Sequence, residues 1–383
     1  MKKKKVVFVG LSGGVDSAVS AALLKKQGYE VVGVFIKTWH PEFLVCNEEA
    51  EQRDAMRVAA HLDIPFLTFD FVDVYKKEVA DYMIREYKKG RTPNPDVMCN
   101  KEVKFGAFLK KALSLGVDFV ATGHYAQKYG GVSSDTEETP PYLAKGADPS
   151  KDQSYFLWTL RQDQLSKILF PVGNLKKTQV RKLAKKFNLP VAEKKDSQGI
   201  CFLGAVDLKD FLKHYIKEKK GKVVNEKGEE IGFHNGAVFH TLGERHGFTI
   251  TKKKSTDGAY YVAGKDVKKN ILVVSQNSPL LVEEGVGGGN LKKNHLALKG
   301  TPPLKGGEEI NLESTNWISK IPEPNKNYTA QIRYHGEFLP CRIEAEGPER
   351  RRRIIFEKPV LVASGQSCVV YDKDVCLGGG VVV

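Results

Sequence analysis

The stretch that decides the fold reads Gly10-Leu11-Ser12-Gly13-Gly14-Val15-Asp16-Ser17. An apolar run over residues 6–9 precedes it and an alanine-rich run over residues 18–24 follows it, so the octet is predicted to join a buried strand to a helix. Glycines let the backbone approach an anion closely, and a helix N-terminus offers free N–H groups and the positive end of the helix dipole. The stretch therefore predicts an anion-binding turn, with a plain glycine turn as the alternative.

The chemistry of the octet differs from that of the common nucleotide-binding loop. Ser12 and Ser17 add hydroxyl donors, but no lysine closes the loop, so it is not a GxxxxGK[ST] motif. Asp16 would repel phosphate unless it orders the backbone amides or holds a magnesium ion. The octet resembles the SGGxDS loop of the ATP-pyrophosphatase (PP-loop) superfamily. That resemblance implies ATP, with Mg²⁺ accompanying it, cleaved between its α and β phosphates to adenylate a substrate.

Composition places the chain among globular proteins with a basic surplus. Its 383 residues are enough for about two or three domains. Hydrophobic residues make up 41% and charged residues 28%, which is ordinary for a soluble protein. Lys and Arg outnumber Asp and Glu by 60 to 46, and the net charge of +14 suits either a polyanion partner or a solvated basic surface. Neither a signal peptide nor a membrane span is predicted, so we expect a cytoplasmic protein.

The order of predicted elements divides the chain into an α/β part and a β-rich part. In the first part strands and helices alternate, over residues 6–9, 18–27, 30–35, 48–62, 64–70, 72–89, 104–115 and 117–125. In the second part short β-branched runs between glycine turns predict strands, over residues 222–224, 236–240, 259–263, 271–274, 328–334, 353–356 and 367–371. We therefore predict three domains: a parallel-sheet domain over 1–208, a small β-rich domain over 209–278 and a β-barrel over 279–383, with a glycine hinge at 285–289.

The six cysteines show neither a CxxC pair nor zinc-type spacing, so no metal site is predicted. The proline-rich segment 91–100, which we expect to be a rigid loop, presents Asp96 and Cys99. Three basic neighbours predict a lowered pKa for the Cys99 thiol, with a buried packing cysteine as the alternative. These neighbours are Arg91, Lys101 and Lys104.

A second cysteine, Cys201, lies in the segment 196–204, which two glycines make pliant. Thiols on loop-like segments far apart in the sequence can meet in space. The sequence leaves open whether Cys99 and Cys201 do so, and whether they form a disulfide or stay apart.

Taken together, these segments resemble the MnmA family of bacterial tRNA-specific 2-thiouridylases, over nearly the whole chain. The resemblance rests on an ordered series of motifs. They are residues 10–17, Thr92-Pro93-Asn94-Pro95-Asp96 with Cys99-Asn100, Ala121-Thr122-Gly123-His124-Tyr125, residues 151–157, residues 196–202, Thr241-Leu242-Gly243, Gln331-Ile332-Arg333-Tyr334 and residues 374–380. The resemblance implies a PP-loop domain, a central domain and a tRNA-binding barrel, and an ATP-dependent 2-thiolation of the wobble uridine of tRNAs for lysine, glutamate and glutamine.

The resemblance further implies a sulfur relay between two cysteines. ATP adenylates O2 of the uridine, and Cys201 carries persulfide sulfur received from a donor protein. Cys99 acts as a nucleophile that either attacks the adenylated carbon or reduces the persulfide to free sulfide. Asp96 serves as general acid or base beside the uracil. AMP, pyrophosphate and 2-thiouridine are the products.

Binding roles follow from the same resemblance. ATP is expected on residues 10–17 with Gly123 and Ile36, the last standing where the family commonly has methionine. The residues expected to contact tRNA are Asn94, Pro95, Asp96, His124, Lys151, Asp152, Gln153, Arg333, Tyr334 and Gln366. Considered without the family, His124 is equally well explained as a polar loop residue.

Other classes of function retain part of this pattern. A small-molecule ATP-pyrophosphatase ligase would keep the loop but needs neither Cys99 nor Cys201. A 4-thiouridine synthetase would carry its RNA-binding domain before the loop, which here begins at Gly10. A tRNA-binding protein without activity needs neither the intact loop nor the two cysteines.

Overall fold

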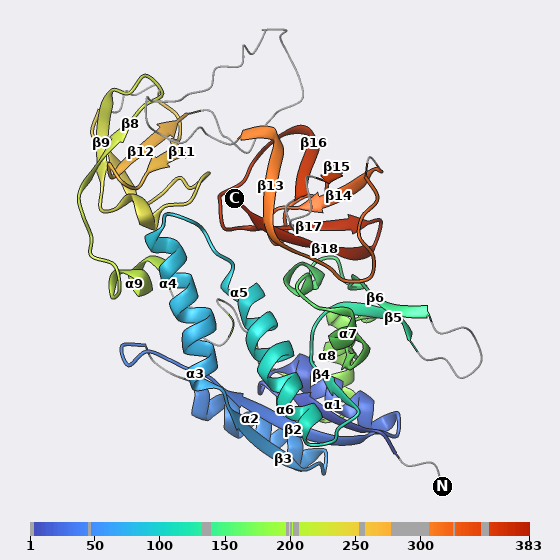
Figure 1. The fold of residues 1–383 in the computed structure, drawn as a ribbon. Helices are drawn as coiled ribbons and strands as arrows, with labels where there is room; N and C mark the ends of the chain where they lie inside the picture. Colours follow the sequence, from blue (N-terminus) through green and yellow to red (C-terminus); the bar gives the residue numbers. More distant parts are fainter. Residues whose placement is uncertain are drawn as a thin grey trace.

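The computed structural model describes residues 4–44, 47–131, 139–196, 199, 201, 207–252, 257–276, 306–324, 326–345 and 352–383. The described strands form three sheets, and the chain passes from a helix-covered sheet through a small β-rich unit to a barrel (Figure 1). The predicted hinge at 285–289 and Cys46 lie outside the described residues. Within the described ranges, no helix combines the length and the apolar character that crossing a membrane requires.

The first sheet has five parallel strands in the order β3-β2-β1-β4-β7. The strands are β1 Val6–Gly10, β2 Glu30–Lys37, β3 Phe66–Asp70, β4 Phe119–Ala121 and β7 Ile168–Leu169. Val7 and Val9 are fully buried in one core and Phe8 is buried in another, as expected for a strand covered on both faces. The sheet confirms the predicted parallel α/β architecture.

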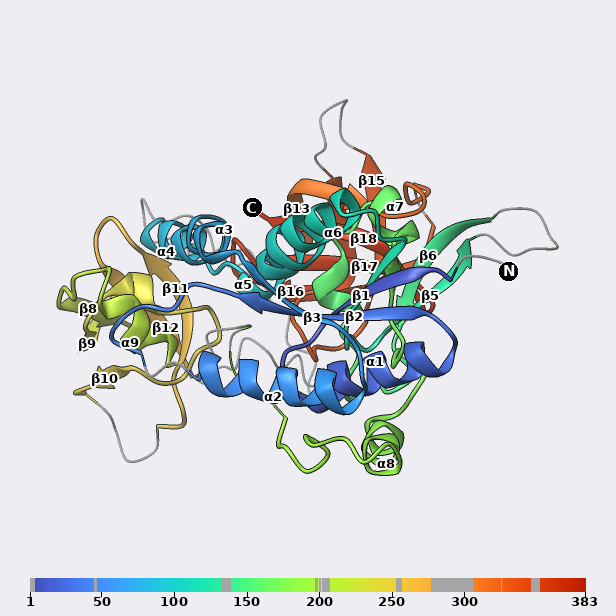
Figure 2. The same ribbon diagram turned by 90° about the horizontal axis from the view of Figure 1, so that it is seen from below.

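Helices cover both faces of this sheet (Figure 2). One core includes residues of α1 Val15–Lys26, α2 Glu48–His61 and α8 Lys177–Lys186. The other core includes residues of two longer helical runs that are partly wound as π-helix. Their segments are α3 Val72–Tyr75, η1 Lys76–Ala80 and α4 Asp81–Lys88, and then α5 Pro95–Met98, η2 Cys99–Phe108 and α6 Leu109–Ser114. Shorter helices are η3 Ser154–Leu157, α7 Gln162–Ser166 and α9 Leu208–Lys213.

The second helical run begins earlier than predicted. Residues 91–100 were expected to form a rigid loop, but α5 starts at Pro95. The side-chain oxygen of Asn94 caps it by accepting a hydrogen bond of 3.1 Å from the first turn, and a proline at the first helical position has no N–H to satisfy. The loop prediction is therefore wrong beyond Asn94, and Asp96 and Cys99 are held on a helix.

The central unit is a five-stranded sheet in the order β10-β9-β8-β12-β11. The strands are β8 Gly221–Val224, β9 Glu230–His234, β10 Phe248–Ile250, β11 Tyr261–Asp266 and β12 Ile271–Ser275. The strand predicted at 236–240 is wrong, because the chain forms a 3₁₀ turn there, η4 Ala237–Phe239. Gly236 enters that turn at a φ of 147°, which side chains rarely adopt, and the Ala237 N–H donates to Asn270 Oδ1 (3.0 Å) instead of to a strand.

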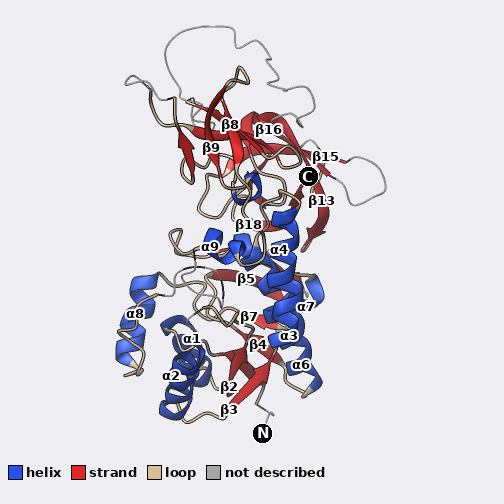
Figure 3. Ribbon diagram, turned by 90° about the vertical axis from the view of Figure 1, so that its left-hand side faces the viewer, coloured by secondary structure: helices blue, strands red, loops and turns tan. Residues whose placement is uncertain are grey.

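The C-terminal unit is a closed antiparallel barrel, as predicted. The strands are β13 Gly306–Trp317, β14 Tyr328–Gln331, β15 Leu339–Ala345, β16 Arg352–Leu361, β17 Ser367–Asp372 and β18 Val375–Val382. β13 pairs with both β16 and β18, so the row β13-β16-β15-β14-β17-β18 closes on itself. Figure 3 shows these strands and those of the central unit at one end of the molecule, with most helices around the parallel sheet at the other.

A hairpin that the sequence did not predict joins the first unit to the barrel. It consists of β5 Ala126–Gly131 and β6 Thr139–Lys145, and β6 pairs with β18 at the outside of the barrel. Side chains strengthen this junction, since Tyr155 OH donates to the Ser367 carbonyl (3.0 Å) and Trp158 Nε1 donates to Ser367 Oγ (3.1 Å). The barrel is thereby fixed against the part of the chain that carries the octet and Cys99.

Candidate active site

The octet lies at the carboxyl edge of the parallel sheet, where strand order reverses between β1 and β4. Such a switch point is the usual ligand site of an open α/β sheet. The turn is closed by its own hydroxyls: the Ser12 N–H donates to Ser17 Oγ (3.2 Å), and Ser17 Oγ donates to the Gly14 carbonyl (3.1 Å). Gly13 has a φ of +71°, and a side chain there would collide with the Glu51 carbonyl.

The neighbouring strands complete this edge with residues that the sequence singled out. Gly123 follows β4, and a Cβ on it would lie 2.7 Å from the Ser17 amide nitrogen, so only glycine lets the strand end reach the start of α1. Ile36 is buried near the end of β2. These positions leave backbone amides and an apolar side chain around one edge, a set that fits a nucleotide phosphate and a base.

Asp16, which was unexpected beside a phosphate site, is fully engaged. Lys177 Nζ lies 2.7 Å from Oδ1 and 2.8 Å from Oδ2 of Asp16, and Tyr125 OH donates to the same carboxylate at 2.7 Å. Sequence analysis did not single out Lys177, because it lies in a run of lysines and arginines typical of a solvated helix face. The spacing of charges gives no signal that this one lysine turns inward.

Lys177 also connects the octet to the segment that leads to Cys201. Its Nζ lies 2.9 Å from Asp196 Oδ1, and Lys151 Nζ lies 2.9 Å from Asp196 Oδ2. Burial would raise the pKa of Asp196, but hydrogen bonds from Lys151 and Lys177 outweigh it and hold that pKa well below its usual range. The ion pairs thus tie the nucleotide edge to the start of the cysteine segment.

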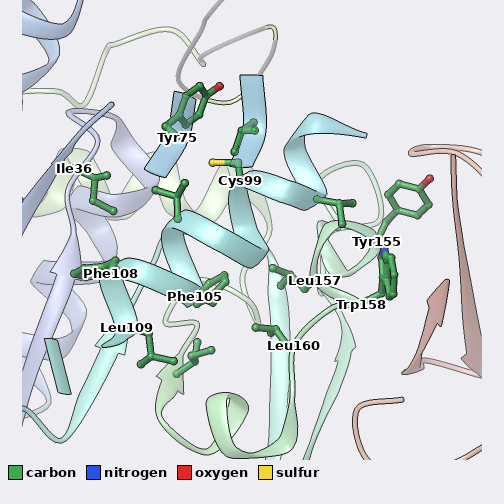
Figure 4. Packing of buried hydrophobic residues seen from close by; sticks show 14 of the residues in the cluster. Ile36, Tyr75, Cys99, Phe105, Phe108, Leu109, Tyr155, Leu157, Trp158 and Leu160 are labelled. Carbon is green, nitrogen blue, oxygen red and sulfur yellow. The ribbon is translucent and has the colours of Figure 1, made fainter. Parts of the chain in front are cut away.

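The structure brings the two singled-out cysteines together. Cys99 Sγ and Cys201 Sγ lie 3.4 Å apart, and both are free thiols. Cys99 is fully buried at the start of η2 within the hydrophobic core (Figure 4). Cys201 as a residue is partly exposed.

Cys201 is held by its backbone on both sides. Its N–H donates to Asp96 Oδ1 (2.8 Å), and its carbonyl accepts a hydrogen bond from Tyr75 OH (2.7 Å). Burial raises the pKa of Asp96, so its carboxyl lies closer to the range of a general acid or base. Tyr75 is fully buried and was missed by sequence analysis, because an aromatic residue on an amphipathic helix is usually a packing residue.

The two thiols have opposite pKa shifts. Burial raises the pKa of the Cys99 thiol well above its usual value, and its hydrogen bond with Cys201 adds to the shift. At Cys201 the hydrogen bond from Cys99 outweighs burial and, together with the positive charge of Lys104, lowers the pKa to about 7. The prediction of a lowered pKa at Cys99 is therefore wrong, and the low-pKa thiol is Cys201.

The basic neighbours of Cys99 explain this correction. Arg91 pairs with Glu86 and Glu313, and Lys101 pairs with Glu102. The remaining neighbour, Lys104, has its hydrogen bond with the sulfur of Cys201 instead. Proximity in sequence to a cysteine did not reveal which sulfur each cation faces.

Several residues expected to contact tRNA hold the site together in this structure. The Asp152 carboxylate accepts hydrogen bonds from the Gly146 N–H (2.8 Å) and the Ser154 N–H (3.1 Å), and Gln153 Oε1 accepts one from the Tyr125 N–H (3.0 Å). These side chains shape the loop, and Lys151 on the same loop reaches toward Asp196.

His124 lies beneath the surface of the site. It is 5% exposed, its Nδ1 lies 2.6 Å from Thr122 Oγ1, and its ring lies against Phe105. Burial, reinforced by the charge of Lys104, lowers the pKa of His124 well below its usual value, so the imidazole is neutral at pH 7.

The expected contacts on the barrel lie at its junction with the other units. The Tyr334 ring centroid lies 4.3 Å from that of Phe156. Arg333 is exposed, and together with Gln366 it lines a cavity of about 280 Å³ shared with Thr241 and Glu244 of the central unit.

The parallel sheet, with its SGGVDS turn at the switch point and a neighbouring pair of thiols, defines a nucleotide-binding protein of the PP-loop class. Residues 5–205, 209–276 and 307–382 match three family descriptions: tRNA methyl transferase HUP domain, tRNA methyl transferase PRC-barrel domain and Aminomethyltransferase beta-barrel domain. The chain belongs to the MnmA family of tRNA-specific 2-thiouridylases.

Three relatives from distant bacteria carry the name tRNA-specific 2-thiouridylase MnmA. That of Streptococcus mutans serotype c is 42% identical, over 99% of this chain and 95% of its own length. The protein of Protochlamydia amoebophila is 40% identical, over 100% of this chain and 94% of its own length. The protein of Francisella philomiragia is 38% identical over 100% of both chains. The similarity thus extends through all three sheets.

Proposed function

We propose that this chain is a tRNA-uridine 2-sulfurtransferase that uses ATP to replace O2 of the wobble uridine with sulfur, in tRNAs for lysine, glutamate and glutamine. The observation that carries the proposal is the 3.4 Å approach of two free thiols beside a nucleotide-binding edge. An ATP-pyrophosphatase that acts on small molecules needs no such pair, and the identity of about 40% with named thiouridylases over the whole chain supports RNA as the substrate.

In the proposed first step, the amides of residues 12–17 hold the phosphates, Gly123 forms the wall beside them and Ile36 packs against adenine. Bound with Mg²⁺, ATP supplies the electrophilic phosphate that turns the uracil oxygen into a leaving group. Pairing of Asp16 with Lys177 removes the repulsion that a bare carboxylate would exert on that phosphate. Asp96 accepts or donates the proton at the uracil.

In the proposed second step, sulfur passes through Cys201. A donor protein with a cysteine persulfide delivers its outer sulfur to Cys201. Cys99 then attacks the inner sulfur of the Cys201 persulfide and passes its thiol proton to the departing sulfur, so a Cys99–Cys201 disulfide forms and hydrosulfide leaves. Hydrosulfide adds to the adenylated carbon, and AMP departs. The short distance between the two sulfurs favours this route over direct attack of Cys99 on the uridine, and a thiol reductant must then reopen the disulfide.

We further propose that the three domains are residues 1–208, 209–278 and 279–383, and that the β5–β6 hairpin packs with the barrel. The tRNA would lie across all three domains. A wobble base must leave its stack to reach Asp96 and the thiols. Asn94 and Pro95 would flank that base. The exposed guanidinium of Arg333 suits a phosphate, and Tyr334 offers a ring for stacking.

The test is a nucleoside analysis. Unfractionated tRNA is incubated with the protein, ATP, Mg²⁺ and a sulfide source, then digested and analysed by mass spectrometry. We expect 2-thiouridine that depends on ATP, with one AMP and one pyrophosphate for each sulfur added. Pyrophosphate release without thiolated nucleoside would point to a small-molecule ligase, and 4-thiouridine would point to a different tRNA thiolase; either result would overturn the proposal.

A further inference from the structure

The π-helical winding of η2 gives Cys99 an uncommon neighbour. In this winding each N–H bonds five residues back, so Lys104 follows Cys99 by one turn instead of lying on another face of the helix. Gly106 permits the winding, because a Cβ there would lie 2.7 Å from the Lys101 carbonyl oxygen, five residues earlier. Such stretches are rare and occur frequently at functional sites.

The charge of Lys104 acts on both sulfurs of the pair. Its ammonium group hydrogen-bonds the sulfur of Cys201. The largest electrostatic influences on the Cys201 sulfur come from Cys99, Lys104 and Asp96, and Tyr75 OH donates a hydrogen bond to the Cys201 carbonyl. Lys104 supplies the positive charge in this set.

We propose that Lys104 is a catalytic residue that holds the sulfur of Cys201, the acceptor in the relay above, as an anion. The proposal rests on the sulfur relay described above. It is consistent with the burial of the two residues, since Cys201 is partly exposed and Cys99 is fully buried.

The step balances without an added oxidant. The Cys201 thiolate attacks the outer sulfur of a donor persulfide, a new S–S bond forms at Cys201, and the S–S bond of the donor breaks. The donor cysteine leaves as a thiolate and takes the proton of the transferred sulfur. The negative charge therefore ends on the terminal sulfur of the Cys201 persulfide, which Lys104 then faces. The pKa of about 7 at Cys201 agrees with this role.

The first test measures which thiol ionises. The whole chain is alkylated with iodoacetamide between pH 5.5 and 10, and mass spectrometry gives the alkylation rate of each cysteine. Each rate is divided by its plateau value at high pH, which removes differences in how accessible each thiol is to the reagent. We expect the Cys201 midpoint near pH 7 and the Cys99 midpoint at least about one unit higher. A Cys99 midpoint at or below that of Cys201 would overturn the proposal, and no variant is needed.

The second test uses matched variants. Lys104→Met is expected to raise the Cys201 midpoint by about one pH unit, and so to lower the alkylation rate at pH 7 several-fold. Lys104→Arg keeps the charge and should keep the midpoint. Lys101→Met removes a charge from the same helix. Because the Lys101 ammonium pairs with Glu102, this variant should leave the Cys201 midpoint unchanged. Circular dichroism checks folding. An unshifted midpoint in folded Lys104→Met would contradict the proposal.

The third test follows sulfur transfer itself, with cysteine persulfide as the probe. Lys104→Met should acquire persulfide on Cys201 several-fold more slowly than wild type at pH 7, while its affinity for ATP stays unchanged. The outcomes separate this inference from the proposed function. Wild type that makes 2-thiouridine while Lys104→Met loads sulfur normally would overturn the inference alone, whereas loading that depends on Lys104 without any 2-thiouridine would overturn the function alone.

Discussion

The ammonium group of Lys177 donates hydrogen bonds to both carboxylate oxygens of Asp16, at 2.7 and 2.8 Å, although 161 positions separate the two residues in the sequence. The same ammonium reaches Asp196, which precedes Cys201 by five positions. One lysine therefore neutralises the acid in the nucleotide turn and fixes the segment that leads to the reactive sulfur. The sequence left open whether this acid orders backbone amides or holds a magnesium ion, and it did not reveal the counter-charge that Lys177 supplies.

Replacing Lys177 should weaken nucleotide binding. In Lys177→Met the Asp16 carboxylate loses its counter-charge beside the phosphates, and loss of a charged hydrogen bond of this kind corresponds to about tenfold or more in affinity. Equilibrium binding of ATP measures the effect. Lys182→Met, on the exposed side of the same helix, should bind ATP like wild type. Equal affinities in the two variants would contradict the assignment of Asp16 and Lys177 to the nucleotide edge.

Gly123 should not tolerate a side chain. In Gly123→Ala the added methyl would meet the Ser17 amide nitrogen at 2.7 Å, so the start of α1 must move away from β4. We expect ATP affinity to fall on the order of tenfold, with a smaller loss of stability. Gly258→Ala is the matched control, because no atom of the described residues lies within 4 Å of its Cβ position. An unaffected ATP affinity in Gly123→Ala would show that phosphates bind elsewhere.

The cysteines should be required for chemistry and not for RNA binding. With cysteine persulfide as the only sulfur source, Cys99→Ser and Cys201→Ser should each abolish formation of 2-thiouridine, while both variants bind tRNA with unchanged affinity in a gel-shift assay. Cys341→Ala, a buried cysteine of the barrel, should retain thiolation. Thiolation that survives in both serine variants would refute the relay.

The Tyr75 hydroxyl should help to hold the sulfur of Cys201 close to that of Cys99. Tyr75→Phe removes the 2.7 Å hydrogen bond to the Cys201 carbonyl without changing the packed ring. When diamide is used as the oxidant, we expect the Cys99–Cys201 disulfide to form about fivefold more slowly. This corresponds to the loss of one hydrogen bond of about 1 kcal/mol. Tyr328→Phe is the control, since that hydroxyl accepts a hydrogen bond from the Glu323 N–H in the barrel (2.8 Å). An equal rate of closure in both variants would exclude this role for Tyr75.

Stability should fall on mild acidification because of a buried histidine. His234 is 1% exposed, and burial, together with His240, lowers its pKa to about 4. An unfolded histidine titrates near pH 6.5, so between about pH 6.5 and 4 the unfolded state binds more protons and the free energy of unfolding decreases as pH falls. Above that window the contribution is constant.

The expected loss is about 1 kcal/mol at pH 5.5 relative to pH 7.5. Urea unfolding at the two pH values measures it, in wild type and in His234→Gln, where that part of the dependence should disappear. His246→Gln, an exposed histidine of the same unit, should retain it. A wild-type profile that is flat across this range would mean that His234 is protonated in the folded state.

Sequence reasoning located the parts of this site better than the contacts between them. Local patterns revealed the octet, the parallel sheet and the barrel, because glycine turns and apolar periodicity act within a few residues. The inward turn of Lys177, the hold of Tyr75 on Cys201 and the reversed pKa order of the two thiols depend on residues distant in the sequence. The segment that begins at Pro95 was predicted as a loop because it contains prolines. The helix-capping signal of Asn94 just before it would have predicted the helix.

The pairing of β6 with β18 has a consequence for biosynthesis. β18 also closes the barrel against β13, so a strand translated after every other described strand completes two structures at once. While the chain emerges from the ribosome, the hairpin that follows β4 must wait with an unpaired edge for a partner more than two hundred residues downstream. A nascent chain arrested before that point would carry a formed nucleotide turn but an exposed β edge, open to chaperones or to self-association.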